Sequence, residues 1–274
     1  YEWSNGETIE DVSGLCDGIY SVIVTDENGC SISIEEEITE PDGMDITYTT
    51  SDYTGYGVSC NGATDGSISV TITGGSGEYL YSWDNGETTE DISDLGAGTY
   101  ILTVTDENNC PQTLTVEITE TDEMAISATL SDYTGYGVSC NGATDGSINI
   151  TVTGGTGIYT YDWSNGEITE NITDLNAGVY SVTVTDENGC SISIEEEITE
   201  SDLMTISAEL LDYTGYGVSC FGECDGGMDI TVTGGTGLYT YEWSNGETIE
   251  DVFGLCAGIY SVIVTDENGC SISI

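Results

Sequence analysis

The chain repeats itself every 80 residues, and this period constrains the fold more than any other feature. The stretch SDYTGYGVSCNGATDG at residues 51–66 returns unchanged at 131–146, and a third version, LDYTGYGVSCFGECDG, occupies residues 211–226. A fixed long period indicates a tandem array of one structural unit. A unit of 80 residues is too long for a solenoid turn and has the size of a small domain.

We therefore divide the chain into four repeats. Repeat 1 (residues 1–41) is the C-terminal half of a unit, repeats 2 (42–121) and 3 (122–201) are complete, and repeat 4 (202–274) is truncated at its C-terminus. The sequence ends in SISI, where the copy at 191–200 continues SISIEEEITE. We expect the chain to be a piece of a longer array.

Apolar and polar residues alternate within each repeat. In repeat 3 the alternation covers INITVT at 148–153, YTYDWS at 159–164 and YSVTVT at 180–185, separated by Gly-rich and Asn-Gly turns. No segment shows a helical period. This pattern predicts an all-β chain, a tandem array of immunoglobulin-like β-sandwich domains of about 80 residues. The junctions leave only two or three residues between predicted strands and contain no flexible Gly/Ser run, so we expect an extended rod.

Aromatic residues at fixed positions sharpen this prediction. Tyr180 follows the turn LNAG at the start of a strong strand, which is the position of the tyrosine corner in immunoglobulin-like domains. Trp163, on a strand ahead of it, is its expected core partner. The predicted core aromatics of the three larger repeats are Trp83, Tyr100, Trp163, Tyr180, Trp243 and Tyr260.

Ten cysteines suit a small domain that needs disulfides to support a marginal core. Each larger repeat has one early and one late cysteine, and repeat 4 gains Cys224 and Cys256 together, which are most simply partners. If Cys224 and Cys256 are bonded, repeat 4 forms one compact body, which favours pairing of the early and late cysteines within each repeat. The predicted disulfides are Cys60–Cys110, Cys140–Cys190, Cys220–Cys270 and Cys224–Cys256.

Two alternatives to this scheme stay open. One joins cysteines across repeat boundaries, beginning with Cys30 to Cys60, and the other leaves free thiols or a metal site, although no CxxC spacing exists. In the favoured scheme the partners of Cys16 and Cys30 would lie upstream of residue 1. Disulfides imply an oxidising, extracellular setting.

The charge balance excludes several partners. The chain has 51 acidic residues and no Lys, Arg or His, a net charge of −51. Nothing in it can neutralise phosphates, so nucleic acid is excluded as a partner, and direct docking on anionic lipid is disfavoured. No apolar run is long enough for membrane insertion. Metal ions, counterions and other proteins, including the neighbouring repeats, are the partners that remain.

Residues 154–190, GGTGIYTYDWSNGEITENITDLNAGVYSVTVTDENGC, together with VSCNGATDGSI at 138–148, resemble the SprB repeat of giant cell-surface adhesins of Bacteroidetes. The resemblance covers essentially the whole chain, once per repeat. It implies a surface filament of a gliding bacterium, exported by the type IX secretion system and associated with the outer membrane. It also implies contact with the gliding machinery and with polysaccharide of the substratum.

Three functions can be weighed from the residues. An enzyme is disfavoured, because the chain lacks His and Lys and its cysteines are expected to be bonded. A structural stalk is favoured. The alternative is a carbohydrate-binding module that uses exposed tyrosines such as Tyr53 and Tyr56 of YTGYG, which could instead pack where repeats meet.

No cofactor is expected, and calcium at the repeat junctions is the one open ligand. The DENG turn repeats Asp186, Glu187 and Asn188, and the ITESD junction repeats Glu200 and Asp202. Such hard oxygen ligands suit Ca²⁺. The competing interpretation is that these residues shape a turn and that the junction acids are solvated.

Overall fold

The computed structural model describes all residues from 1 to 274 and contains strands, turns and loops without a helix. No helix is therefore present that could cross a membrane. The chain divides into two compact units, one formed by Tyr1–Val58 with Gly62–Glu120 and the other by Ser59–Asn61 with Thr121–Ile274. The three residues Ser59–Asn61 thus leave the body of repeat 2 and belong with the second unit.

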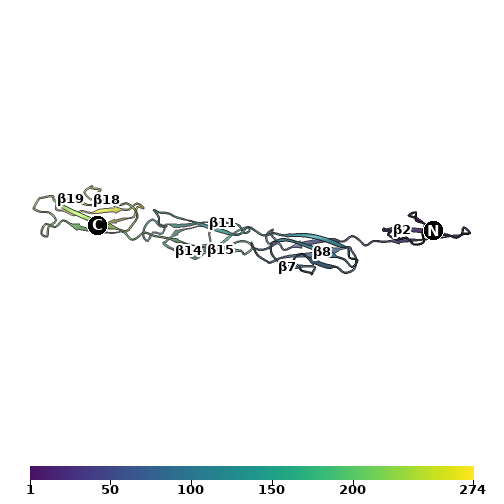
Figure 1. The fold of residues 1–274 in the computed structure, drawn as a ribbon. Helices are drawn as coiled ribbons and strands as arrows, with labels where there is room; N and C mark the ends of the chain where they lie inside the picture. Colours follow the sequence, from purple (N-terminus) through teal and green to yellow (C-terminus); the bar gives the residue numbers. More distant parts are fainter. The chain divides into compact units, whose positions relative to one another are not determined.

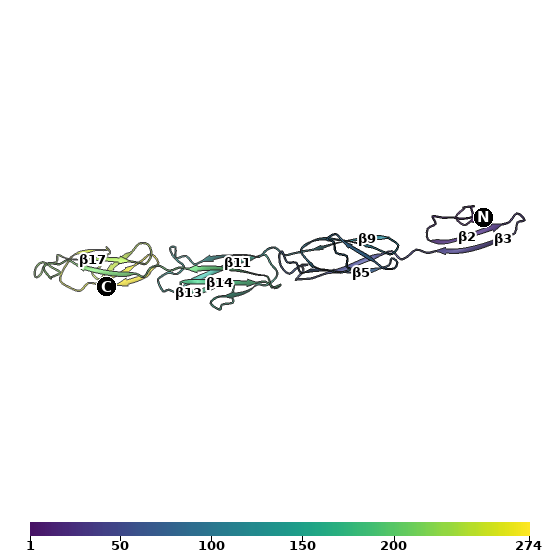
Figure 2. The same cartoon turned by 60° about the horizontal axis from the view of Figure 1, so that its bottom comes forward.

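Each larger repeat builds two three-stranded antiparallel sheets, and repeat 3 illustrates the plan (Figures 1 and 2). Its strands are β10 (Ala125–Leu130), β11 (Gly146–Thr153), β12 (Thr160–Trp163), β13 (Ile172–Leu175), β14 (Gly178–Thr185) and β15 (Ser191–Ile198). One sheet has the order β10-β11-β13 and the other β12-β14-β15. The first, second and fourth strands thus face the third, fifth and sixth, which is the arrangement of an immunoglobulin-like sandwich without one edge strand.

The other repeats follow the same order. Repeat 2 contains β4 (Asp45–Thr50), β5 (Gly66–Thr73), β6 (Leu80–Trp83), β7 (Ile92–Leu95), β8 (Gly98–Thr105) and β9 (Pro111–Ile118). Repeat 4 contains β16 (Thr205–Leu210), β17 (Gly226–Thr233), β18 (Thr240–Trp243), β19 (Val252–Leu255), β20 (Val262–Thr265) and β21 (Ser271–Ser273). Repeat 1 forms one sheet of β1 (Glu2–Trp3), β2 (Gly18–Thr25) and β3 (Ser31–Ile38). The chain is thus an all-β tandem array of immunoglobulin-like sandwiches.

The inward residues of the alternating strands form one core in each sandwich. In repeat 3 this core contains Ile148, Trp163, Val182 and Ile198, each no more than 3% exposed. The indole N–H of Trp163 donates to the carbonyl of Thr169 at 2.8 Å, so the buried ring leaves no polar atom unpaired. Trp83 and Trp243 are buried in the same way.

The corner tyrosines pack at the rim of the core. The hydroxyl of Tyr180 donates to the carbonyl of Asn176 at 3.1 Å, four residues upstream, as a tyrosine corner requires. Tyr100 and Tyr260 make the same bond to residues 96 and 256. All three tyrosines are half-buried against the cores, whereas the tryptophans lie within them.

The direction of the strands decides which loops can meet. β15 begins directly after the turn at 186–190 and ends beside the loop that joins β10 to β11, where the amide of Gly137 donates to the Thr199 carbonyl at 2.9 Å. A strand of eight residues spans about 25 Å. The two loops therefore lie at opposite ends of their sandwich.

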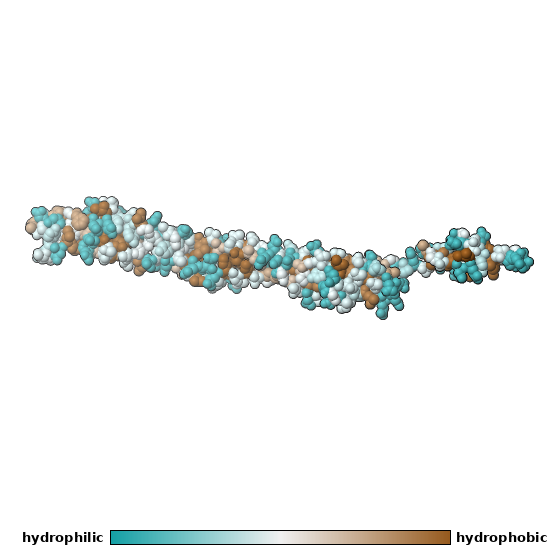
Figure 3. All heavy atoms as spheres, viewed as in Figure 1, coloured by the Kyte–Doolittle hydropathy of each residue, from teal (hydrophilic) through white to brown (hydrophobic).

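The surface carries no single large apolar face in the view of Figure 3. Hydrophobic residues reach it as separate brown patches between hydrophilic and neutral ones. Scattered exposure of this kind is normal for a soluble surface.

Candidate inter-repeat junction

Two cysteine-bearing segments meet where one repeat joins the next. We call residues 51–66, 131–146 and 211–226 the early loops, and residues 26–30, 106–110, 186–190 and 266–270 the late turns. The structure contains the disulfides Cys60–Cys190, Cys140–Cys270 and Cys224–Cys256. The first two each span 130 residues and join the early loop of one repeat to the late turn of the following repeat.

This pairing corrects the scheme expected from the sequence. The bonds Cys60–Cys110, Cys140–Cys190 and Cys220–Cys270 do not form, nor does Cys30–Cys60. The reason is geometric, because early loop and late turn of one repeat lie about 25 Å apart and a disulfide needs Cα atoms within about 7 Å. Four cysteines have no disulfide partner and are exposed, namely Cys16, Cys30, Cys110 and Cys220.

The disulfide within repeat 4 obeys the same geometry. Cys224 in the early loop and Cys256 after β19 lie at one end of the sandwich and are joined, the pair that their joint appearance predicts. The equivalent positions of repeat 2 are already neighbours, since a Cβ atom at Gly96 would lie 3.8 Å from Cγ2 of Thr64. The extra cysteines thus link two segments that the fold also brings together in repeat 2.

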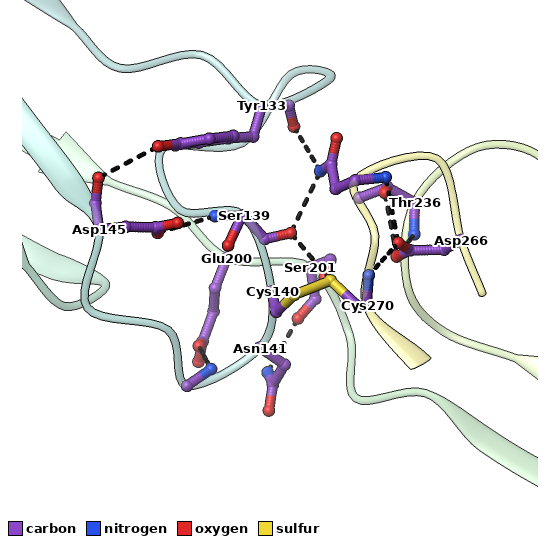
Figure 4. Close-up of a disulfide and its surroundings, with 12 residues drawn as sticks. Tyr133, Ser139, Cys140, Asn141, Asp145, Glu200, Ser201, Thr236, Asp266 and Cys270 are labelled. Atoms are coloured by element: carbon purple, nitrogen blue, oxygen red, sulfur yellow. Dashed lines mark hydrogen bonds between the residues drawn. A yellow bond between two sulfur atoms is a disulfide. The ribbon is translucent and has the colours of Figure 1, made fainter. Parts of the chain in front are cut away.

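The junction of repeats 3 and 4 lies wholly inside the second unit and contains the Cys140–Cys270 disulfide (Figure 4). Asn268 of the late turn organises it. The side-chain amide of Asn268 donates to the carbonyls of Tyr133 at 3.0 Å and Ser139 at 3.2 Å. Its side-chain oxygen accepts from the hydroxyl of Thr134. Every polar atom of this side chain is therefore engaged by the early loop of the preceding repeat, beside the Cys140–Cys270 bond.

The preceding junction has the same construction. Within the second unit, the side-chain amide of Asn188 donates to the Ser59 carbonyl at 3.2 Å, next to the Cys60–Cys190 bond. The same contact thus recurs in two different pairs of repeats. Its recurrence indicates a feature of the repeat itself rather than of one copy.

The segment that links the repeats is longer than expected but firmly tied. Six residues, 199–204, separate β15 from β16, where the sequence predicted two or three. The side chain of Asn141 donates to the Ser201 carbonyl at 2.9 Å, and the amide of Gly142 donates to a Glu200 carboxylate oxygen at 2.7 Å. The early loop therefore holds the linker as well as the late turn.

A buried carboxylate shapes the late turns of repeats 2, 3 and 4. One oxygen of Asp266 accepts from the amides of Asn268 at 3.1 Å and Cys270 at 2.8 Å, and the other accepts from the amide and hydroxyl of Thr236 at 2.9 and 3.1 Å. Four donors thus solvate the charge in place of a cation. In repeat 2, the hydrogen bond from the Cys110 amide, together with those from Ser76, lowers the pKa of Asp106.

These hydrogen bonds bear on whether calcium binds at the repeat junctions. The carboxylate of Asp186 is occupied by the amides of Asn188 and Cys190 and by Thr156. No group of three or more His, Cys, Asp or Glu side chains is arranged to hold a metal ion. The geometry therefore favours the turn-shaping role of the DENG sequence.

The repeated tyrosines also belong to the junction. The amide and carbonyl of Tyr133 bond those of Tyr136, which folds the YTGYG segment back on itself. This places the Tyr133 carbonyl where Asn268 donates to it. Hydrogen bonds from Ser139 lower the pKa of the nearby Asp145, which keeps its charge and holds the loop in shape. The backbone of this loop thus contributes to the packing between repeats 3 and 4.

Comparison with known families identifies the repeat. Residues 57–88, 138–167 and 218–248 each match the SprB repeat. The chain contains three SprB repeats. SprB is a gliding-motility surface adhesin of Bacteroidetes, and SprB repeats together with disulfides point to an extracellular surface protein.

Each matched segment of the SprB repeats takes in one early cysteine and one tryptophan, as in Cys140 and Trp163 of the second match. The late turns lie outside the matched segments. The partners of Cys60 and Cys140 are thus outside the part of the SprB repeat that the match defines. Sequence periodicity located both cysteines, but only the strand directions show which ones can meet.

Solved structures give weak similarities. The N-terminal eight immunoglobulin domains of Down Syndrome Cell Adhesion Molecule align over 98% of this chain and 51% of that one, with 10% identity and a TM-score of 0.29. A Ca²⁺-stabilised ice-binding adhesin of an Antarctic bacterium aligns over 93% and 80%, with 17% identity and a TM-score of 0.34. This chain spans about half the length of the first structure. No curated protein sequence matches it.

Proposed function

We propose that this chain is a stalk segment of a secreted adhesin, displayed as an outer-membrane-associated filament that serves adhesion in gliding motility. The observation that carries the proposal is the pair of disulfides between successive repeats. A catalytic domain needs its cross-links where they support a cleft. Cross-links that bind each repeat to the next instead suit a segment that must transmit tension along its length.

The chemistry of the chain agrees with this role. The chain has no His or Lys, and four hydrogen-bond donors occupy the buried Asp266 carboxylate, so this carboxylate is not available as a general base. We infer that each of the ranges 42–121, 122–201 and 202–274 is one domain of the stalk. The gliding machinery and substratum polysaccharide are its proposed partners through other parts of the parent protein.

An antibody raised against the chain tests the proposal on intact cells of the bacterium that encodes it. We expect label on unpermeabilised cells, movement of the label along the cell body, and weaker attachment when the antibody is present. Serum absorbed with the purified chain is the control. Label that reaches its target only in permeabilised cells would contradict surface display, and immobile surface label would contradict the gliding role.

A further inference from the structure

One early loop and one late turn of the larger repeats have no disulfide partner. The early loop of repeat 4 carries the exposed Cys220, and the late turn of repeat 2 carries the exposed Cys110. In the junctions the corresponding cysteines are bonded to each other. The unpaired segments can therefore be compared directly with bonded ones of nearly the same sequence.

The unpaired early loop keeps two hydrogen bonds of the bonded one. The amide of Ser219 donates to Asp225 at 3.0 Å, as that of Ser139 donates to Asp145 at 3.0 Å. The Tyr213 amide donates to the Tyr216 carbonyl at 2.7 Å, the distance found between Tyr133 and Tyr136. Both bonds form without a late turn against the loop, so part of the conformation needed for binding is present beforehand.

The disulfide of repeat 4 explains how the loop keeps its shape. In repeat 3 the Asn141 side chain anchors the loop to the linker through Ser201. Repeat 4 has Phe221 at that position, which cannot make this bond and is fully exposed. The Cys224–Cys256 bond instead ties the loop to its own sandwich.

The unpaired late turn is equally complete. The amide of Cys110 donates to Asp106 at 2.8 Å, the distance of Cys270 to Asp266, and the Glu107 amide donates to the Ser76 carbonyl at 3.1 Å. Asn108 is exposed, whereas its counterpart Asn268 is half-buried against an early loop. The turn thus presents an asparagine and a thiol in the form that an early loop accepts.

We propose that the surface formed by Tyr213, Ser219 and Cys220 is a binding site for the late turn of a repeat that follows repeat 4 in the same chain. The turn's asparagine amide donates to the carbonyls of Tyr213 and Ser219. Its cysteine and Cys220 lose two electrons and two protons to a thiol oxidant of the extracellular setting, such as oxidised glutathione, and form the disulfide. Phe221 cannot make the bond that Asn141 makes to the linker, so this junction lacks one of the contacts found between repeats 3 and 4.

The test extends the full chain by one repeat in register. Residues 191–194 and 271–274 are both SISI, so a copy of residues 195–274 placed after Ile274 continues the strand without a seam. The copy brings its own versions of Cys220, Cys224, Cys256 and Cys270. The extended chain is oxidised with a glutathione buffer, unfolded without reduction, alkylated and weighed.

We expect a monomer that takes up four alkyl groups, the same number as the parent chain. The copied late cysteine forms a disulfide with Cys220, whereas the copied early cysteine stays free. The matched variant Cys220→Ser should take up five. Uptake of six would overturn the proposal, since both cysteines would then be free. Disulfide-linked multimers would overturn the assignment to a following repeat and place the turn on a second copy of the chain.

A second measurement tests the proposal in a chain that cannot form the disulfide to Cys220. In the extended Cys220→Ser chain, a late turn that binds through its asparagine should slow hydrogen exchange at residues 213–219 relative to the unextended Cys220→Ser chain. An Asn→Ala change in the copied turn should abolish that protection. Equal exchange in all three chains would show that the loop does not bind the turn.

Discussion

At the residue scale, the buried aspartates show how a chain without cations places charge inside a fold. Asp106, Asp186 and Asp266 are no more than 5% exposed, and each accepts hydrogen bonds from its own turn and from the neighbouring Gly-Gly loop. The aspartate therefore links two segments that are far apart in sequence. The buried charge stabilises the fold because four N–H and O–H groups donate hydrogen bonds to it.

The acid stability of the chain should depend on Asp106. Its pKa in the folded state lies below the ordinary value, chiefly through the Cys110 amide. A lowered folded pKa contributes stability above the ordinary pKa of about 3.9, and this contribution is lost as the pH falls through the folded value. Asp106→Asn places an amide against the Ser76 donors and should lower the melting temperature at pH 7.

Melting curves of both proteins from pH 7 to pH 2 measure this effect. The difference in melting temperature should be constant near neutrality and shrink below about pH 4, where the wild-type carboxylate protonates. Glu107→Gln, at the exposed next position of the same turn, is the control and should leave the difference near zero. A difference that persists undiminished at the lowest pH would contradict the assignment.

Thr121 provides the second residue-scale prediction. It is 2% exposed, and its hydroxyl is the one buried side-chain polar atom with no hydrogen-bond partner. Its carbonyl accepts from Asn61, a bond that any residue there would keep. Thr121→Val removes the unpaired hydroxyl at nearly constant volume and should stabilise the second unit by about 1 kcal/mol.

Urea unfolding curves of Thr121→Val and the parent chain check this value. Ser201→Ala, at the equivalent position of the next linker, is the control, because the Ser201 hydroxyl is not both fully buried and unpaired. Stabilisation of both variants to the same degree would show that general hydrophobicity, and not the orphan hydroxyl, is responsible.

At the element scale, the alternation of apolar and polar residues predicted most strands correctly, whereas most of the predicted disulfide pairing was wrong. INITVT, YTYDWS and YSVTVT became β11, β12 and β14 because residues of period two line one buried face. The number of strands between Trp163 and Tyr180 could not be counted, since β13 (Ile172–Leu175) has only four residues and no clear alternation. Without β13 in the count, the sequence did not determine at which end of the sandwich each loop lies.

The missing strand explains the wrong disulfides. Cys140 and Cys190 belong to the same repeat but lie at opposite ends of β15. This separation follows only from the full strand order. Cys224 and Cys256 could be paired from sequence because both were gained by one repeat. The junction bonds of Asn268 left no signal that a single sequence could separate from an ordinary Asn-Gly turn.

The loop pairing predicts an engineered disulfide in repeat 2. Thr64→Cys with Gly96→Cys copies the Cys224–Cys256 pair to positions whose atoms would already lie 3.8 Å apart. Gly96 has an ordinary negative φ, so a side chain is tolerated there. A loop of about 30 residues closed in this way stabilises by about 3 kcal/mol, less any strain.

Thermal melting with and without reductant measures the gain. The double variant should melt higher than the parent only when oxidised, and each single variant should not. Thr64→Cys with Gly86→Cys, at a glycine with open space around it, is the control that should form no bond. A failure of the first pair to oxidise would show that the two loops are not adjacent in repeat 2.

At the scale of the whole molecule, the two junction disulfides close covalent loops that overlap. The loop from Cys60 to Cys190 and the loop from Cys140 to Cys270 share the residues between Cys140 and Cys190. Tension that enters at Cys60 crosses to Cys190, runs back through repeat 3 to Cys140 and crosses to Cys270. This route contains only 50 residues of a stretch that contains 210.

Single-molecule pulling by the termini tests this topology in a parent chain that carries Cys224→Ser and Cys256→Ser, because the Cys224–Cys256 bond would otherwise shorten the route from Cys190 to Cys270 to about 48 residues. At about 3.4 Å per extended residue, the stretch from Cys60 to Cys270 should reach about 170 Å when oxidised and about 700 Å when reduced. Cys140→Ser with Cys270→Ser leaves only the Cys60–Cys190 bond, so the shortest path becomes the 80 residues from Cys190 to residue 270. The oxidised variant should therefore extend about 100 Å further than the oxidised parent. Disulfides confined to single repeats would predict a far larger gain, about 340 Å, because the same two substitutions would then break two bonds and free about 100 residues. A gain near the larger value would refute the overlapping loops, and a gain near the smaller one would establish that each repeat resists extension through bonds to both of its neighbours.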